Sequence, residues 1–447
     1  MVSAELTDLR QLFDRLFPIC RSITGPGIRD SLQIFSEHMD LEIHGVPTGT
    51  RVLDWTVPAE WSLERARLFG PDGEVVLDTR DSNLHVVNFS EPFSGEMDLD
   101  ALQAHLFSDP TQPDAIPYVT SYYVPRWGLC LSQRQRDALK PGRYRVEIET
   151  RKDDGVLNYG VAELPGETDD VFLITSYLCH PSMANNELSG PLALLRVWEK
   201  LAALDTRKFT YRFLLIPETI GSICYLARHG QDLVERMRGG LVLTCLGGPS
   251  QTVSFKTSRR DWTGDPAPVD RLARHLASAE PDIFAVRDFT PAGGSDERQF
   301  CSPGFNLPMA QAARTTYGEY EEYHTSLDNL DFMTIRAVEA SADRVMSALL
   351  SHEVFETRYR NTIPHGEPQL GRRGLYPTLN GPMTSQFSTD SEQDGRKALE
   401  RLLCLLSLAD GTRTLLQIAG HIGCSVRHLE PIARHLESEG ILEDVSQ

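Results

Sequence analysis

Two histidines stand beside amide and carboxylate side chains at the ends of apolar runs. His180 follows the run at 171–178 and shortly precedes Asn186 and Glu187, and His324 lies in a second loop rich in aromatic and acidic residues. Neutral imidazole is a good zinc ligand, and metal ligands often converge on loops at strand ends. Together the two segments predict the two halves of a zinc hydrolase site. Either histidine taken alone is more often a hydrogen-bonded loop residue.

A candidate general base ends another apolar run. Glu218 follows the segment 211–216. A carboxylate there is partly desolvated, so its pKa rises toward the range that is useful for a base. The alternative is a first-turn charge of a helix over 221–236, because helix N-termini favour acidic side chains. Glu187 lies in the first turn of an earlier helix. It either contacts substrate or metal, or is an acidic side chain favoured by the helix N-terminus.

A polar loop and an aromatic residue supply the remaining candidates. Asp296 and Glu297 are adjacent to Arg298. They either hold a substrate amine, bind metal or form an ion pair with the arginine, and the ion pair is slightly favoured. Tyr323 is a candidate substrate contact. Asp328, four residues after His324, is expected to orient that imidazole through a hydrogen bond.

The elements that must position these residues alternate between strand and helix over about 155–355. Strands are predicted at 171–176, 211–216 and 240–246, and helices at 190–204, 221–236 and 267–279. This alternation predicts an α/β domain with a mostly parallel sheet, in which ligands bind beyond the carboxyl ends of the strands. We predict N-terminal helices over 1–44, a β-rich insertion over 45–150, the α/β domain and a linker over 151–393, and a helical module over 394–447.

Composition narrows the class of protein. The formal net charge is -19, which disfavours a nucleic-acid partner, because affinity for phosphate backbones depends largely on Lys and Arg. We expect no membrane span, no signal peptide and a cytoplasmic location. The eight cysteines are dispersed without a CxxC pair and are expected to be reduced. The expected partner is a small-molecule or peptide-like substrate, and a homo-oligomer is an open possibility.

The C-terminal module has the pattern of a helix-turn-helix with a wing. A helix over about 399–406 precedes a turn at Asp410-Gly411, Gly423 ends the second helix and Ser425 caps the third. The third helix is not strongly basic. We therefore predict a docking or dimerisation module in preference to a DNA-binding one.

The combined motifs resemble a bacterial aminopeptidase-like family in the clan of zinc aminopeptidases and glutaminyl cyclases. The resemblance spans nearly the whole chain. It rests on CHPSMANNELSG at 179–190, PETIGS at 217–222, GGSDERQF at 293–300, YHTSLDNLD at 323–331, RSITG at 21–25 and VLDWTVPAEW at 52–61. It implies a zinc-aminopeptidase-like α/β fold with helices on both faces of a mostly parallel sheet, a β-rich inserted domain and a C-terminal winged-helix-like module.

The chemistry of that clan implies two zinc ions bridged by an aspartate, with a glutamate as general base. By position, His180 and His324 each ligate one zinc and Glu218 is the base. Asn186 stands where the bridging aspartate is expected, and Thr219 and Gly248 stand where further acidic ligands are expected. Because neutral groups do not offset the charge of two zinc ions, we expect one ion or none in preference to two.

Three functional hypotheses remain open. The first is an aminopeptidase-fold enzyme that hydrolyses, or transfers an acyl group from, an amide or aminoacyl-type small substrate. The second is a non-catalytic binding or scaffold protein derived from a peptidase. The third and weakest is a transcription factor that uses the C-terminal module. They are ranked in that order on fold-level analogy.

Overall fold

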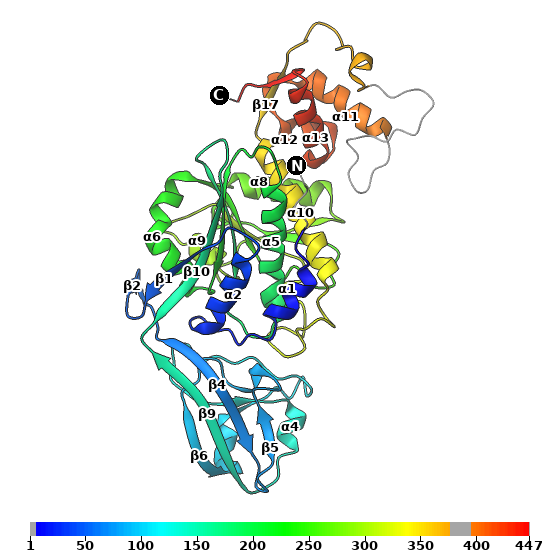
Figure 1. Ribbon diagram of the computed structural model, residues 1–447. Coiled ribbons are helices and arrows are strands. Elements are labelled where there is room, and N and C mark those ends of the chain that lie inside the picture. The colour runs from blue at the N-terminus through cyan, green and yellow to red at the C-terminus, as the bar shows by residue number, and fades with distance from the viewer. Residues whose placement is uncertain (1–5, 376–394, 447) are drawn as a thin grey trace.

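The computed structural model describes residues 6–375 and 395–446. A central α/β domain lies between a β-rich domain, cyan and blue at the bottom of Figure 1, and a small helical module, orange and red at the top. In the described part of the chain, no helix has the length and apolar character needed to cross a membrane.

The central sheet has eight strands and is mostly parallel in its middle. The order is β1-β10-β12-β11-β13-β16-β14-β15. β11 is parallel to both β12 and β13, and β13 is parallel to β16, whereas β1, β10 and β14 form antiparallel pairs with their neighbours toward the sheet centre. The strands are β1 (Glu42–Pro47), β10 (Val156–Leu164), β11 (Val171–Tyr177), β12 (Thr210–Ile216), β13 (Met237–Leu243), β14 (Val253–Lys256), β15 (Phe284–Arg287) and β16 (Met309–Ala313). The strands predicted at 171–176 and 211–216 are confirmed, and the one predicted at 240–246 begins and ends three residues earlier, as β13.

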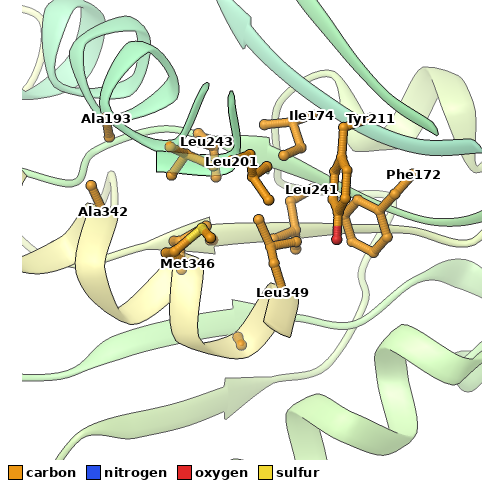
Figure 2. Packing of buried hydrophobic residues seen from close by; sticks show 14 of the residues in the cluster. Phe172, Ile174, Ala193, Leu201, Tyr211, Leu241, Leu243, Ala342, Met346 and Leu349 are labelled. Carbon is orange, nitrogen blue, oxygen red and sulfur yellow. The ribbon is translucent and has the colours of Figure 1, made fainter. Parts of the chain in front are cut away.

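Helices cover both faces of this sheet because its central strands are apolar on both sides. One face packs against α2, α5, α8 and α10, and Figure 2 shows Met346 and Leu349 of α10 facing Leu241 and Leu243 of β13. The opposite face packs against α6 and the short α9. The helices are α1 (Leu9–Leu16), α2 (Pro26–Ser36), α5 (Ser189–Ala202), α6 (Ile220–Arg236), α7 (Arg259–Trp262), α8 (Pro268–Ala279), α9 (Glu297–Phe300) and α10 (Ile335–Val354).

The helix that leaves the end of β11 lies unusually close to the sheet. A Cβ atom added to Gly190 would lie 2.3 Å from Ser176 Oγ and 2.4 Å from the Leu243 carbonyl oxygen. Only glycine permits this approach without a shift of the backbone. The first residues of α5, and the loop that leads into them, are thereby held against the carboxyl end of the sheet.

The inserted domain has an antiparallel sheet in the order β5-β4-β9-β6 and a hydrophobic core of its own. Its residues 116–118 return to the α/β domain, where Pro117 forms a bridge with Thr325 and the Tyr118 amide donates to the His324 carbonyl at 2.8 Å. The elements are β2 (Arg51–Val52), β3 (Trp55–Thr56), β4 (Glu60–Phe69), β5 (Val75–Asp78), β6 (Phe93–Asp98), α3 (Leu99–Leu102), β7 (Leu106–Phe107), β8 (Leu129–Cys130), α4 (Gln133–Asp137) and β9 (Arg143–Asp153). The insertion therefore borders the loop that carries one of the two histidines.

The C-terminal module begins earlier than the sequence indicates. β17 (Arg358–Asn361) pairs with both β18 (Asp410–Thr414) and β19 (Leu442–Asp444), so the wing includes residues that the sequence pattern assigns to the linker. Residues 376–394 of that expected linker lie outside the described residues. The helices are α11 (Gly395–Leu408), α12 (Leu415–Ile422) and α13 (Val426–Ser438). The predicted helix ends at Gly423 and Ser425 are confirmed.

The third helix of this module is packed against the α/β domain. Arg427 of α13 donates through Nε and Nη2 to the two carboxylate oxygens of Glu280 at 3.1 and 3.0 Å, and both side chains are buried. Arg434 donates to Glu353 of α10 at 2.7 Å. A bidentate, buried pair of this kind is geometrically specific. The helix that would enter a DNA groove in other helix-turn-helix proteins is therefore used here as an internal contact.

Replacing Arg427 by Ala is expected to lower the free energy of unfolding by about 1.5–3 kcal/mol, because charge-assisted hydrogen bonds are lost and Glu280 remains buried. Thermal unfolding monitored by calorimetry checks this value. The matched control is Arg413→Ala in the same module, where the ion pair with Asp410 is exposed. Equal effects of the two substitutions would show that the buried pair does not hold the module in place.

Candidate active site

Three residues that lie far apart in the sequence meet beyond the carboxyl ends of β11 and β12. His180 follows β11 and Glu218 follows β12, and the His180 Nε2 atom lies 3.8 Å from a Glu218 carboxylate oxygen. The ring centroids of His180 and His324 are 5.4 Å apart. This is the edge of a parallel sheet at which ligands bind in α/β proteins. The sequence-predicted histidines and glutamate are thus brought together.

His180 is oriented by a buried carboxylate. Its Nδ1 atom is 2.6 Å from Glu187 Oε2, and Glu187 is fully buried. Burial by itself lowers the pKa of His180, but the adjacent Cys179 and Glu187 groups outweigh this effect and raise it well above its usual value. Nε2 is left facing Glu218. Glu187, predicted to contact substrate, instead lies behind the histidine.

A buried arginine from the N-terminal segment completes this network. Arg21 is fully buried and its Nε atom lies 3.7 Å from Glu187 Oε1. The same Nε donates to the His180 carbonyl at 2.9 Å, and Nη1 donates to the Leu16 carbonyl at 2.7 Å. Arg21 therefore neutralises Glu187 and holds the backbone at His180.

Glu218 is the carboxylate of this region that a ligand can reach. Its side chain is 28% exposed, whereas Glu187, Asp296, Glu297 and Asp328 are fully buried. Burial is the largest influence on the pKa of Glu218 and raises it, opposed by His180 and by the Ser295 hydroxyl, which donates to Oε1 at 2.6 Å. A partly exposed carboxylate with a raised pKa is suited to accept a proton.

Asp296 and Glu297 both have protein partners. Asp296 Oδ1 accepts a hydrogen bond from the Thr219 amide at 2.7 Å. Glu297 pairs with buried Lys256 at 2.9 Å and not with Arg298, so the expected ion pair exists with a different cation. Lys256 also donates to backbone carbonyls of the loop that carries Ser295. Neither carboxylate is exposed in a position to hold a substrate amine.

His324 is surrounded by aromatic rings. Tyr323 stacks on it with ring centroids 3.9 Å apart, and Tyr118 of the inserted domain contacts both His324 and His180, at 5.2 and 5.3 Å. Burial, together with the charge of His180, lowers the pKa of His324 to about 3, so the imidazole is neutral. Tyr323 is half-buried and remains a predicted substrate contact.

Asp328 does not orient His324. Its two carboxylate oxygens accept hydrogen bonds from the Asn185 and Asn186 amides at 2.6 and 2.8 Å. These amides open the π-helical turn η3 (Ala184–Leu188), whose first N–H groups have no partner within the helix. The expectation of a direct hydrogen bond to the histidine was therefore wrong, and the aspartate instead fixes the turn that carries Asn186 and Glu187.

The donor set does not match a two-zinc site. The Asn186 side-chain oxygen Oδ1 already accepts from the Tyr177 hydroxyl at 3.1 Å, and a neutral amide bridges two cations poorly. A Cβ atom at Gly248 would lie 2.5 Å from the Thr315 side chain, so an acidic residue there has no room. Thr219 offers no carboxylate. The position of each missing acid is thus occupied by a neutral residue or closed by a neighbour.

Donor atoms that could hold a single ion gather around His180. Among the described residues, the group Cys179, His180 and Glu187 has donor atoms close enough for one metal ion. Within that group, however, Glu187 already bonds the histidine and faces Arg21, and burial raises the pKa of the Cys179 thiol to about 11. On the opposite side of the imidazole, His180 Nε2 lies 3.8 Å from Glu218 and the ring centroid of His324 lies 5.4 Å from that of His180.

Several contributors were not foreseen as site residues. Arg21 lies in an otherwise apolar stretch, FPICRSI at 17–23, and a charge in such a stretch was the available signal. Ser295 and Lys256 gave no comparable signal, since their roles depend on which loops meet. Tyr118 belongs to the inserted domain, 62 residues before His180, and only tertiary contact reveals it.

Comparison with known proteins identifies relatives across the whole chain. Residues 10–355 match the family described as domain of unknown function (DUF4910), and residues 357–444 match a winged helix-turn-helix. A protein of Clostridium acetobutylicum, named for polysaccharide biosynthesis and an aminopeptidase-like domain, is 39% identical over 423 residues, which are 95% of this chain and 93% of that protein.

Solved structures agree with this relationship. A C. acetobutylicum protein whose name describes a peptidase superposes with a TM-score of 0.85 at 37% identity, covering 98% of this chain and 96% of the other. A zinc aminopeptidase from Bacillus subtilis superposes with a TM-score of 0.55 at 12% identity, covering 77% and 95%. The second likeness shows that the α/β domain has the fold of a zinc aminopeptidase.

Proposed function

We propose, on the premise that this chain belongs to the DUF4910 family and has an aminopeptidase-like fold, that it is an enzyme acting on the amide bond of a small aminoacyl-type or acylamino substrate. The reaction is hydrolysis or acyl transfer. The observation that carries the proposal is the position of Glu218, which is reachable by a ligand and lies 3.8 Å from His180 Nε2. The other acidic side chains around it are fully buried.

The side chains present can divide the work of amide cleavage. Glu218 takes the proton of the attacking water or amine and later returns it to the leaving nitrogen. His180, held by Glu187, presents Nε2 toward the substrate carbonyl and stabilises the negative charge that develops on its oxygen. A single zinc ion on His180 and His324 would supply the same polarisation when bound. The rings of Tyr118 and Tyr323 pack against the His324 ring and help to fix its position.

The name of the C. acetobutylicum relative supports one substrate class in particular. A protein of polysaccharide biosynthesis with an aminopeptidase-like domain would meet amide bonds on acylated amino sugars. Such a bond has the carbonyl and nitrogen that the Glu218 and His180 pair can serve. The substrate panel should therefore contain N-acyl amino sugars and sugar nucleotides beside aminoacyl amides.

The test is turnover of that panel by the purified full-length chain, followed by mass spectrometry of the products. We expect at least one amide to be cleaved or transferred by the wild type. A wild type that turns over no member of the panel, with or without added zinc, would support the second candidate, a non-catalytic scaffold. The observation that favours the scaffold is that neutral residues stand at the acid positions, as described for Asn186 and Gly248.

Zinc content provides a separate prediction. We expect no more than one zinc ion per chain after loading and buffer exchange, because catalytic zinc takes about three protein ligands and the accessible donors number no more than that. Elemental mass spectrometry of the loaded wild type and of His180→Ala measures it. Two ions per chain, or an ion that persists in His180→Ala, would contradict the assignment of the donors.

A further inference from the structure

The residue that follows Glu218 has a strained backbone. Thr219 has φ 64° and ψ -72°, and the Ile220 amide donates to the Glu218 carbonyl at 2.7 Å. These values define a γ-turn of the positive-φ type, which is rare and strained. A β-branched residue is especially unfavourable at positive φ. Strain of this kind persists only where surrounding contacts enforce it.

One buried side chain supplies the enforcing contact. Asp296 Oδ1 accepts a hydrogen bond from the Thr219 amide at 2.7 Å, and Asp296 is fully buried. The next residue back in that loop, Ser295, donates to the Glu218 carboxylate at 2.6 Å. The loop at 295–296 therefore holds both the backbone and the side chain at Glu218.

We infer that Asp296 is a positioning residue, which holds the strained γ-turn at Thr219 and thereby directs the Glu218 carboxylate toward His180. The effect of Asp296 on catalysis rests on the proposed function. Its stabilisation of the turn at Thr219 is a property of the fold and does not depend on that function. Burial, and then the nearby Glu218, raise the pKa of Asp296 to about 8. The hydrogen bond from the Thr219 amide requires only an acceptor oxygen, which Asp296 Oδ1 provides in either protonation state of the carboxyl group.

Because Asp296 holds a turn that is strained by threonine, the effect of replacing Asp296 should depend on the residue at position 219. Asp296→Ala leaves the Thr219 amide without its acceptor, so the turn relaxes and Glu218 moves; we expect kcat/KM to fall at least about 10-fold. Glycine adopts positive φ without strain. Thr219→Gly should therefore rescue Asp296→Ala, bringing the double variant to within about 2-fold of Thr219→Gly alone. Asp296→Asn keeps an acceptor oxygen and should retain most of the activity.

A matched control distinguishes the stabilisation of the turn by Asp296 from a general loss of stability. Asp270 is also fully buried and accepts hydrogen bonds from the backbone amides of Ser258 and Ala267. Asp270→Ala should lower the melting temperature equally in the wild type and in the Thr219→Gly variant. The wild type, the two single variants and the double variant are also compared by thermal unfolding. Asp296→Ala should lower the melting temperature of the wild type clearly less than that of the Thr219→Gly variant, because relaxation of the strained turn offsets part of the lost hydrogen bond only when threonine is present.

Melting temperature tests whether Asp296 holds the turn, and activity tests the proposed function. Equal losses of melting temperature for Asp296→Ala in the wild type and in the Thr219→Gly variant would overturn the inference. Loss of activity in Asp296→Asn as large as in Asp296→Ala would also overturn it, because the carboxyl itself would then be required. A wild type without activity on any substrate overturns the proposed function, while the melting temperatures still decide whether Asp296 holds the turn.

Discussion

Replacing Glu218 by Gln is expected to lower kcat/KM on any substrate of this protein by about 100- to 10,000-fold, the usual contribution of a general base. The substitution keeps the size of the side chain and can still accept from the Ser295 hydroxyl. It removes the group that takes the proton. Steady-state kinetics with the best substrate of the panel measures the effect.

The pH dependence of the wild type gives an independent check of the same role. A base must be deprotonated, so kcat/KM should rise with pH through the pKa of Glu218, which burial raises above its ordinary value. The titration of His324 should not change kcat/KM near neutral pH, because its pKa is lowered to about 3. The matched control is Glu235→Gln, an exposed glutamate on α6. Comparable activity of Glu218→Gln and the wild type would exclude Glu218 as the base.

Replacing Arg21 by Ala is expected to lower the free energy of unfolding by about 3–5 kcal/mol, because removing one partner of a buried ion pair leaves the other charge uncompensated. Arg21 and Glu187 are both fully buried. The substitution also removes hydrogen bonds to the carbonyls of Leu16 and His180. Denaturant unfolding followed by circular dichroism provides the measurement.

The control for this prediction is another arginine of the N-terminal region. Arg10 pairs with Asp14 at 2.9 Å on the surface of α1, with both side chains more than half exposed. Arg10→Ala should therefore cost only about 0.3–0.5 kcal/mol. Arg21→Met combined with Glu187→Gln should recover part of the lost stability, since neither buried charge remains. Similar costs for Arg10→Ala and Arg21→Ala would show that burial of the pair is not the source of the stability.

Hydrophobic pattern alone located the main elements of the site-bearing domain. The apolar runs before His180 and Glu218 form β11 and β12, which are parallel neighbours in the sheet. Because the carboxyl ends of parallel strands meet at one edge, the proximity of these two residues followed from the pattern. The start of the winged-helix module was predicted too late, because β17 is short and its partners lie about 50 residues or more further on.

Local pattern was therefore sufficient to predict the fold class and the strand ends that carry His180 and Glu218, whereas the family resemblance singled out Asn186. Long-range packing determines which carboxylates a ligand can reach. Burial depends on partners from distant segments: Arg21 lies against Glu187, Lys256 against Glu297 and the Thr219 amide against Asp296. Glu218 instead faces His180 and accepts a hydrogen bond from Ser295 at the edge of the sheet, and its side chain stays 28% exposed.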